Sequence, residues 1–373
     1  MFENHYHYSV GNRKTFFKQQ AIIWATETGE TLRYILPNWL RELPVHIEPQ
    51  ESLEQLCERR ARAIRESNDR VRIYYSGGVD SGYMLDTFIK NNLHIDEIVM
   101  AKSGIAEADW EIESVAVPYV ESLRTKIPQT KITILSPTMN DYMEWFKNAY
   151  WFENYTKLGK IYGFTALRLN RKLLSTSIND TGSKSANVFG LDKPFIHFVN
   201  GEWYTLTLDV SGDERQLDTS DNTFYAFYQD DPLIYTKQCH LLKRSIESNI
   251  PNKKDYNKVC FWDPKYQRLW NTSVNRVATE KKFIMKNLDS IPEYGAMNAK
   301  DSVAQKYMAE NCPKIYKNFL EGIKNLNCIS GGDWFNQGDS RYGDVGVFAD
   351  FKSIDRNSTK TVDELYPHGF KLQ

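Results

Sequence analysis

Residues 71–81 read Val71-Arg72-Ile73-Tyr74-Tyr75-Ser76-Gly77-Gly78-Val79-Asp80-Ser81, and they carry the strongest structural signal in this 373-residue chain. The first five residues favour a buried β-strand, and the residues from Ser81 to about Asn91 have helical spacing. The two glycines at the junction let the main chain come close to an anion. The N–H groups of such a turn, and of the helix N-terminus that follows it, then point at that anion. We therefore expect a phosphate-binding loop at residues 76–81.

Strands and helices alternate on both sides of this loop. This alternation is typical of an α/β fold in which a parallel sheet carries helices on both faces. Ligands bind at the carboxyl ends of the strands in such sheets, which is where the loop lies. Further strands are predicted over 95–101, 131–135 and 187–189, and helices over 52–67, 109–126, 139–150 and 163–174.

Two common phosphate loops do not fit these residues. A Walker A loop needs a Gly-Lys-Ser/Thr ending, which is absent, and the spacing of Gly77, Gly78 and Gly82 does not match Gly-x-Gly-x-x-Gly. The pattern that remains, Ser-Gly-Gly-x-Asp-Ser, resembles the signature of the PP-loop ATP pyrophosphatases. This family includes asparagine synthetase, GMP synthetase, NAD synthetase and the tRNA-thiolating enzymes. The alternative is that the hexapeptide is merely a tight surface turn.

The resemblance implies a fold and a reaction. The implied fold is the Rossmann-like fold of the adenine nucleotide alpha-hydrolase-like (HUP) superfamily, with an accessory α+β region. The implied cofactors are ATP and Mg²⁺. The loop would hold the β,γ-phosphates while an acceptor oxygen attacks the α-phosphate, and a nucleophile would then displace AMP from the adenylated acceptor. Among the members of this family, the implied reaction is most similar to that of the synthetase domain of asparagine synthetase.

The resemblance also implies roles for the loop residues. Asp80 would hold Mg²⁺ and take part in catalysis. Ser81 could cap the helix or donate to a phosphate oxygen. The residues expected to bind the nucleotide phosphates are Ser76, Gly77, Gly78, Val79, Asp80 and Ser81.

Two further stretches are candidates for the same site. Gly190-Leu191-Asp192-Lys193 follows a predicted strand, and we expect Asp192 and Lys193 to act in catalysis by stabilising charge at the α-phosphate. A polar turn that leads into a hairpin explains this stretch equally well. Ala101, Lys102 and Ser103 end the second strand, at the position where the family reads adenine and ribose.

The chain divides into three predicted regions: an N-terminal cap or sheet extension over 1–50, the ATP-binding core over 51–200, and an accessory substrate region over 201–373. Asn200-Gly201 between two apolar runs predicts a β-hairpin at the second boundary. The predicted helix over 52–67 opens the core. We expect its arginines on a solvated surface, namely Arg59, Arg60, Arg62 and Arg65.

Composition excludes several classes of protein. The net charge is −1 and the pI about 6.7, so bulk charge does not indicate nucleic-acid binding, although a local basic patch stays possible. No apolar run approaches the ~20 residues that span a membrane, and the N-terminus lacks a secretory signal. Five cysteines without a Cys-x-x-Cys indicate neither a disulfide scaffold nor a zinc cluster. We expect a cytoplasmic protein without a membrane partner.

These signals predict an ATP-dependent ligase or amidotransferase-type enzyme. It would adenylate an acceptor oxygen on a small molecule, release pyrophosphate and pass the activated group to a nitrogen nucleophile. No glutaminase signature is found, and too few residues precede the loop for such a domain, so ammonia, an amine or a partner subunit would supply the nitrogen. Two alternatives stay open: an enzyme that thiolates or amidates a nucleic-acid base, and a non-catalytic module that binds an adenine nucleotide.

Overall fold

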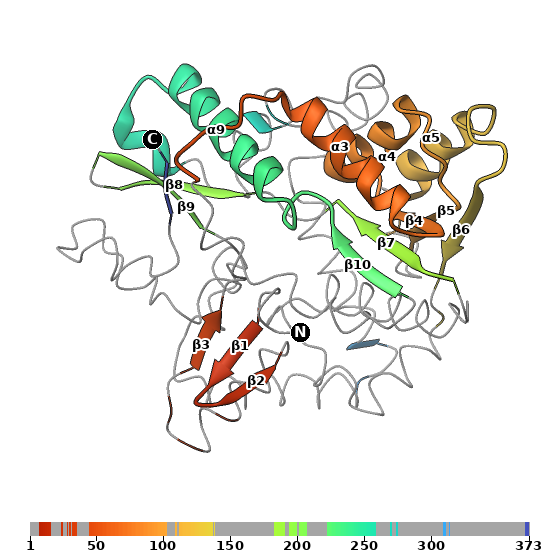
Figure 1. Ribbon diagram of the computed structural model, residues 1–373, viewed down its shortest axis with the longest axis horizontal. Helices are drawn as coiled ribbons and strands as arrows, with labels where there is room; N and C mark the ends of the chain where they lie inside the picture. Colours follow the sequence, from red (N-terminus) through yellow and green to blue (C-terminus); the bar gives the residue numbers. More distant parts are fainter. Residues whose placement is uncertain are drawn as a thin grey trace.

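The computed structural model describes 7–15, 32–35, 45–102, 112–136, 183–190, 194–199, 201–206, 222–258 and 370–372, with residues 24, 28, 30, 109, 138, 269, 270, 274, 309, 310 and 313. These residues form a five-stranded parallel sheet, two smaller antiparallel sheets and a layer of helices (Figure 1). The helices predicted over 139–150 and 163–174 lie outside them.

The parallel sheet has the strand order β10-β7-β4-β5-β6, and every neighbouring pair runs parallel. β5 and β6 lie in succession on one side of β4, whereas β7 and β10 lie on the other side. The direction in which the chain adds strands therefore reverses between β4 and β7. The prediction of an α/β fold with a parallel sheet is confirmed. The strands are β4 Arg70–Tyr74, β5 Glu97–Ala101, β6 Lys131–Leu135, β7 Ser185–Phe189 and β10 Asn222–Ala226.

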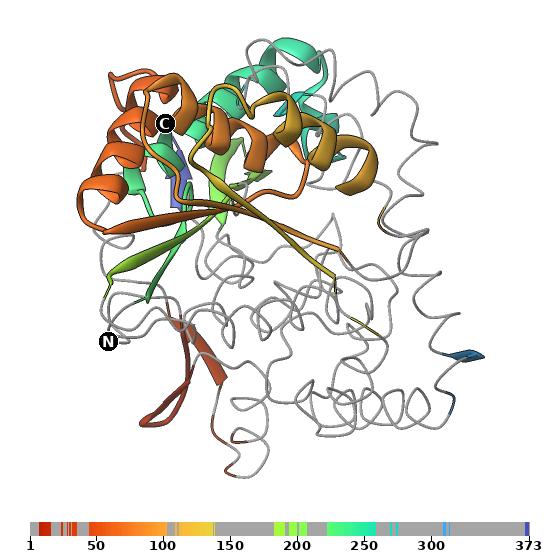
Figure 2. The ribbon, with the colours of Figure 1, turned by 90° about the vertical axis from the view of Figure 1, so that its right-hand side faces the viewer.

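The described helices cover one face of this sheet, as Figure 2 shows. α3 contacts both α4 and α9. The core between the helices and the sheet is apolar: Val71, Ile73 and Val188 from the strands are buried together with Leu56 and Phe88 from the helices. The helices are α3 Leu53–Glu66, α4 Val79–Lys90, η3 Ile112–Ala116, α5 Val117–Ser122, α9 Pro232–Asn249 and η5 Lys253–Lys258.

Local sequence explains where two of these helices begin. α3 starts at a capping box in which Ser52 Oγ accepts the Gln55 N–H at 3.1 Å and Gln55 Oε1 accepts the Ser52 N–H at 2.8 Å. The predicted helix over 109–126 is instead the π-helix η3 followed by the short α5. Pro118 near the start of α5 has no N–H and its ring crowds the carbonyl four residues earlier, so a regular α-helix cannot run through this point.

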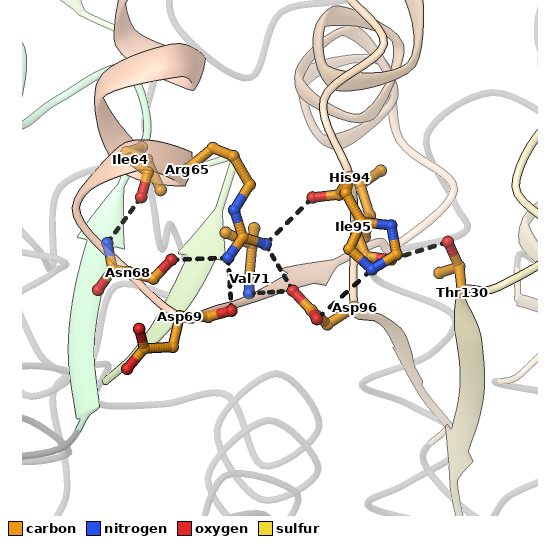
Figure 3. A network of polar contacts seen from close by, with 9 residues as sticks. All are labelled: Ile64, Arg65, Asn68, Asp69, Val71, His94, Ile95, Asp96 and Thr130. Carbon is orange, nitrogen blue, oxygen red and sulfur yellow. Dashed lines mark hydrogen bonds and ion pairs between the residues drawn. The ribbon is translucent and has the colours of Figure 1, made fainter. Parts of the chain in front are cut away.

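A polar network fixes the amino ends of β4 and β5 (Figure 3). The loop at 76–81 follows the other end of β4. The Arg65 guanidinium donates to Asp96 Oδ2 at 2.6 Å and to the carbonyls of Asn68 and Asp69 at 2.6 and 2.5 Å. Asp96 Oδ2 also accepts the Val71 N–H at 2.8 Å. Arg65 is therefore not the solvated residue that the sequence predicted, because it ties the last turn of α3 to the sheet.

The N-terminal residues form a separate antiparallel sheet. β1 His7–Val10 pairs with β2 Arg13–Thr15 on one side and with β3 Leu32–Ile35 on the other. None of these strands joins the parallel sheet.

A second small sheet contains the predicted hairpin. β8 Phe195–Val199 pairs with β9 Glu202–Leu206, and Val199 lies opposite Glu202, so the turn has two residues and Gly201 takes φ +88°. β11 Phe370–Leu372 is its third strand. β10 and α9 follow this hairpin in the chain but belong to the parallel sheet and its helix layer, so the core extends past residue 200. None of the described helices combines the length and the apolar character needed to cross a bilayer.

Candidate functional site

The loop at residues 76–81 joins β4 to α4. Gly77 has φ +85°, in the left-handed region that favours glycine, and Gly78 is extended with φ −74° and ψ 162°. α4 begins at Val79, with Gly78 as its N-cap. The predicted strand, loop and helix are therefore confirmed at this position. The sequence suggests Ser81 as a cap of the helix. It is not the cap, because it already lies in the first helical turn.

The Ser81 hydroxyl braces the loop from inside. Ser81 is buried, and its Oγ accepts the Ser76 N–H at 3.2 Å and donates to the Gly78 carbonyl at 3.1 Å. The Ser76 hydroxyl lies 3.0 Å from Ser81 Oγ and accepts the Gly78 N–H at 3.3 Å. These bonds hold the bend closed. Ser76 is exposed, so its hydroxyl is the one of the two that a ligand can reach.

Two main-chain donors at this bend lack an acceptor within the described part of the chain, one from the buried Gly77 and one from the part-exposed Val79. Gly78 has no side chain that could satisfy the donors in the first turn of α4. The helix adds partial positive charge at this end. Amide groups in such a position bind anions, and phosphate oxygens in particular.

Two buried aromatic residues hold Asp80. The Tyr228 hydroxyl donates to the Asp80 carbonyl at 2.6 Å, and the Trp270 indole N–H donates to Asp80 Oδ1 at 2.6 Å. Burial raises the pKa of the Tyr228 phenol, as do the nearby Cys57 and Asp80, so the hydroxyl stays a donor. No motif in the sequence points to either residue, because they lie 148 and 190 positions from Asp80.

Gly190, at the end of β7, presses against the first turn of α4. A Cβ there would lie 2.8 Å from both Cα and N of Ser81 and 3.0 Å from the carbonyl carbon of Asp80. This approach lies where the strand order reverses between β4 and β7, and open parallel sheets bind ligands at such a position. The predicted catalytic residues Asp192 and Lys193 fall outside the described residues, so their role stays a prediction.

The carboxyl end of β5 lies at the same end of the sheet as the loop that follows β4. Ala101 is the last residue of β5, and the Lys102 N–H donates to the Leu135 carbonyl at 2.7 Å. Lys102 Nζ lies 2.7 Å from Glu113 Oε1, which compensates its charge. The structure thus brings Ala101 and Lys102 to the edge that carries the loop, while Ser103 lies outside the part of the chain described.

The described acidic side chains do not form a metal site by themselves, but Asp80 could bind a metal ion that also binds phosphate. Within the described ranges, no three His, Cys, Asp or Glu side chains come together as a metal site. Mg²⁺ usually takes one or two carboxylates and completes its octahedron with phosphate oxygens and water. A carboxylate can accept several bonds, so the contact of Asp80 with Trp270 is compatible with a metal. Asp80 therefore fits the role of a single carboxylate ligand.

Comparisons with known proteins add no family to these observations. No protein-family model matches the chain, and no curated protein or solved structure is significantly similar to it. The functional interpretation therefore depends on the geometry of the loop and on the residues around it.

Proposed function

We propose that this chain binds Mg²⁺ and ATP at residues 76–81 and adenylates an acceptor oxygen with release of pyrophosphate. The observation that carries the proposal is the position of the loop. The N–H groups of Gly77 and Val79, without an acceptor among the described residues, lie at a helix N-terminus. That terminus follows the parallel strand at which the strand order reverses. A polyphosphate is the common ligand of such a position.

The order of the parallel strands supports a Rossmann-like fold. With β4, β5, β6, β7 and β10 numbered 1 to 5 along the chain, the sheet reads 3-2-1-4-5 from its β6 edge. Doubly wound nucleotide-binding domains have this order, with the phosphate-binding turn after strand 1. Here the loop follows β4, which is strand 1. Loop sequence and strand order together favour the adenine nucleotide alpha-hydrolase-like (HUP) superfamily and, within it, a PP-loop ATP pyrophosphatase.

Each loop residue has a distinct part in this proposal. The amides of Gly77 and Val79 donate to oxygens of the β- and γ-phosphates, and the exposed Ser76 hydroxyl does so when its proton turns from Ser81 Oγ to the ligand. Asp80 binds Mg²⁺, which when present neutralises phosphate charge and stabilises the leaving pyrophosphate. Ser81 does not contact the nucleotide, because its hydroxyl is used inside the loop. Its role is to keep the amides of the bend in place.

The remaining predicted residues complete the reaction. The acceptor oxygen forms a bond to the α-phosphorus while the bond from that phosphorus to the bridging oxygen of pyrophosphate breaks. Asp192 and Lys193 stabilise charge at this centre, and Ala101, Lys102 and Ser103 contact the adenosine. A nitrogen nucleophile, from ammonia, an amine or a partner subunit, then displaces AMP from the activated small molecule.

Pyrophosphate release from ATP tests the proposal. The purified chain is incubated with Mg²⁺, ATP and pools of small carboxylic acids, with and without ammonium, and pyrophosphate and AMP are measured. We expect no pyrophosphate without an acceptor, and pyrophosphate and AMP in equal amounts when an acceptor and a nitrogen nucleophile are both present. Asp80→Asn is the matched variant, because it removes one charge and keeps the size of the side chain. It should lose pyrophosphate release and keep the urea midpoint of the unmodified chain, and undiminished release would contradict the proposal.

The same assay separates the two alternatives. An enzyme that modifies a nucleic-acid base would release pyrophosphate only when RNA or DNA replaces the small acceptors. A non-catalytic module would bind ATP, measured by calorimetry, and release no pyrophosphate with any acceptor.

A further inference from the structure

We propose that Trp270 is a positioning residue that sets the affinity of the phosphate loop for Mg²⁺ by orienting the Asp80 carboxylate. This inference rests on the proposed function of the loop. The indole nitrogen of Trp270 lies 2.6 Å from Asp80 Oδ1, and Trp270 has 0 % of its surface exposed. Hydrogen bonds to a carboxylate are shorter and stronger than those between neutral groups. The Trp270 contact is of this kind.

Burial of Trp270 restricts the orientation of the Asp80 carboxylate. An indole has one donor and no acceptor, and a buried donor that loses its partner is costly. If the Asp80 side chain turned away, the N–H of the fully buried Trp270 would lose this acceptor. The large ring cannot follow Asp80, because it is enclosed on all sides. The carboxylate is therefore held in one orientation before a ligand arrives.

The main chain of the same residue is held independently. The Tyr228 hydroxyl donates to the Asp80 carbonyl at 2.6 Å, and the ring of Tyr228 is itself buried. Tyr228 thus fixes the backbone of the first turn of α4, and Trp270 fixes the side chain that this turn carries. Such preorganisation matters most for groups that meet a charged ligand, because the protein does not reorganise when the ligand binds.

A matched pair of variants tests the role of Trp270. Trp270→Phe keeps a buried ring and deletes the donor. Trp203→Phe is the control. Trp203 lies in β9, is also buried, and its indole donates to Glu247 Oε1 of α9 at 2.8 Å. We expect Trp270→Phe to raise the Mg²⁺ concentration for half-maximal pyrophosphate release about tenfold, equivalent to about 1.4 kcal/mol. Trp203→Phe should leave that concentration unchanged. Equal Mg²⁺ dependence in the two variants would overturn the inference.

A second readout needs no variant of Trp270. Nine tryptophans give nine indole N–H signals in a ¹H–¹⁵N spectrum. We expect Asp80→Asn to move one of these signals, and Mg²⁺ with ATP to move the same signal in the unmodified chain. If Asp80→Asn moves none of them, the contact does not exist in solution and the inference is wrong. If the unmodified chain neither binds ATP nor releases pyrophosphate, the proposed function fails first and the role of Trp270 fails with it.

Discussion

Replacing Gly190 with alanine would place a methyl group against the main chain of α4. The new Cβ would lie 2.8 Å from Cα and N of Ser81, which is 0.6 Å short of the 3.4 Å at which ordinary van der Waals contact begins. The atoms that it meets belong to the backbone, so no side chain can rotate out of the way. The first turn of α4 cannot easily move either, because Tyr228 and Trp270 hold Asp80.

The cost can be estimated from comparable changes. Forcing an extra methyl group into a packed interior costs typically 1–3 kcal/mol, and more where the backbone must shift. We expect Gly190→Ala to lower the free energy of unfolding by about 3 kcal/mol. It should also displace the amides of Val79 and Gly77, so the affinity for Mg²⁺ and ATP should fall at a temperature where the variant is folded.

Urea denaturation measures the loss of stability, and calorimetric titration with ATP measures the loss of affinity. Gly201→Ala is the control, because a Cβ at Gly201 meets nothing within 4 Å although its φ is +88°. It should cost about 1 kcal/mol from backbone strain alone and leave ATP binding unchanged. If Gly190→Ala unfolds at the urea concentration of the unmodified chain and binds ATP equally well, the close packing of β7 on the loop is refuted.

Two further predictions concern the scaffold. Arg65→Met removes a part-buried charge that bonds to Asp96 and to three carbonyls, and it should lower the free energy of unfolding by about 2 kcal/mol in urea titrations. Arg124→Met, at an exposed pair with Glu121, should leave the midpoint unchanged, and equal effects would refute the network of Figure 3. Partial burial opposes ionisation of Glu48, but hydrogen bonds and charges from Arg244 and Lys237 outweigh it and hold the pKa of Glu48 at about 2. Because this pKa lies below the ordinary 4.5, the stabilisation is complete above pH 4.5 and is lost as the pH falls towards 2. Glu48→Gln should therefore be less stable than the unmodified chain at pH 6, with a difference that shrinks towards pH 2; a constant difference would contradict this assignment.

Local signals in the sequence predicted the elements that depend on local interactions. Ser52 and Gln55 form a capping box within one turn, so the start of α3 could be placed. Gly77 and Gly78 between an apolar run and a helical pattern determined where the loop lies. Pro118 was a usable signal that a regular helix could not continue, although the prediction did not use it.

Contacts between distant residues left no such signal. The residues of 222–226 do not say that β10 pairs with β7 rather than with the hairpin, so the sequence places them in the accessory region. Trp270 and Tyr228 resemble any other core aromatic residues in the sequence. Only the folded chain shows that both donate to Asp80.

An amide titration of the loop tests whether its main chain binds the phosphates of ATP. Signals of the Gly77 and Val79 N–H groups are followed in a ¹H–¹⁵N spectrum while Mg²⁺ and ATP are added. We predict saturable shifts that are largest at Gly77, Gly78 and Val79, and that are much smaller for the amides at the opposite edge of the sheet, near Asp96. Saturable ATP binding that leaves the signals of Gly77 and Val79 unmoved would show that the triphosphate does not bind at this loop.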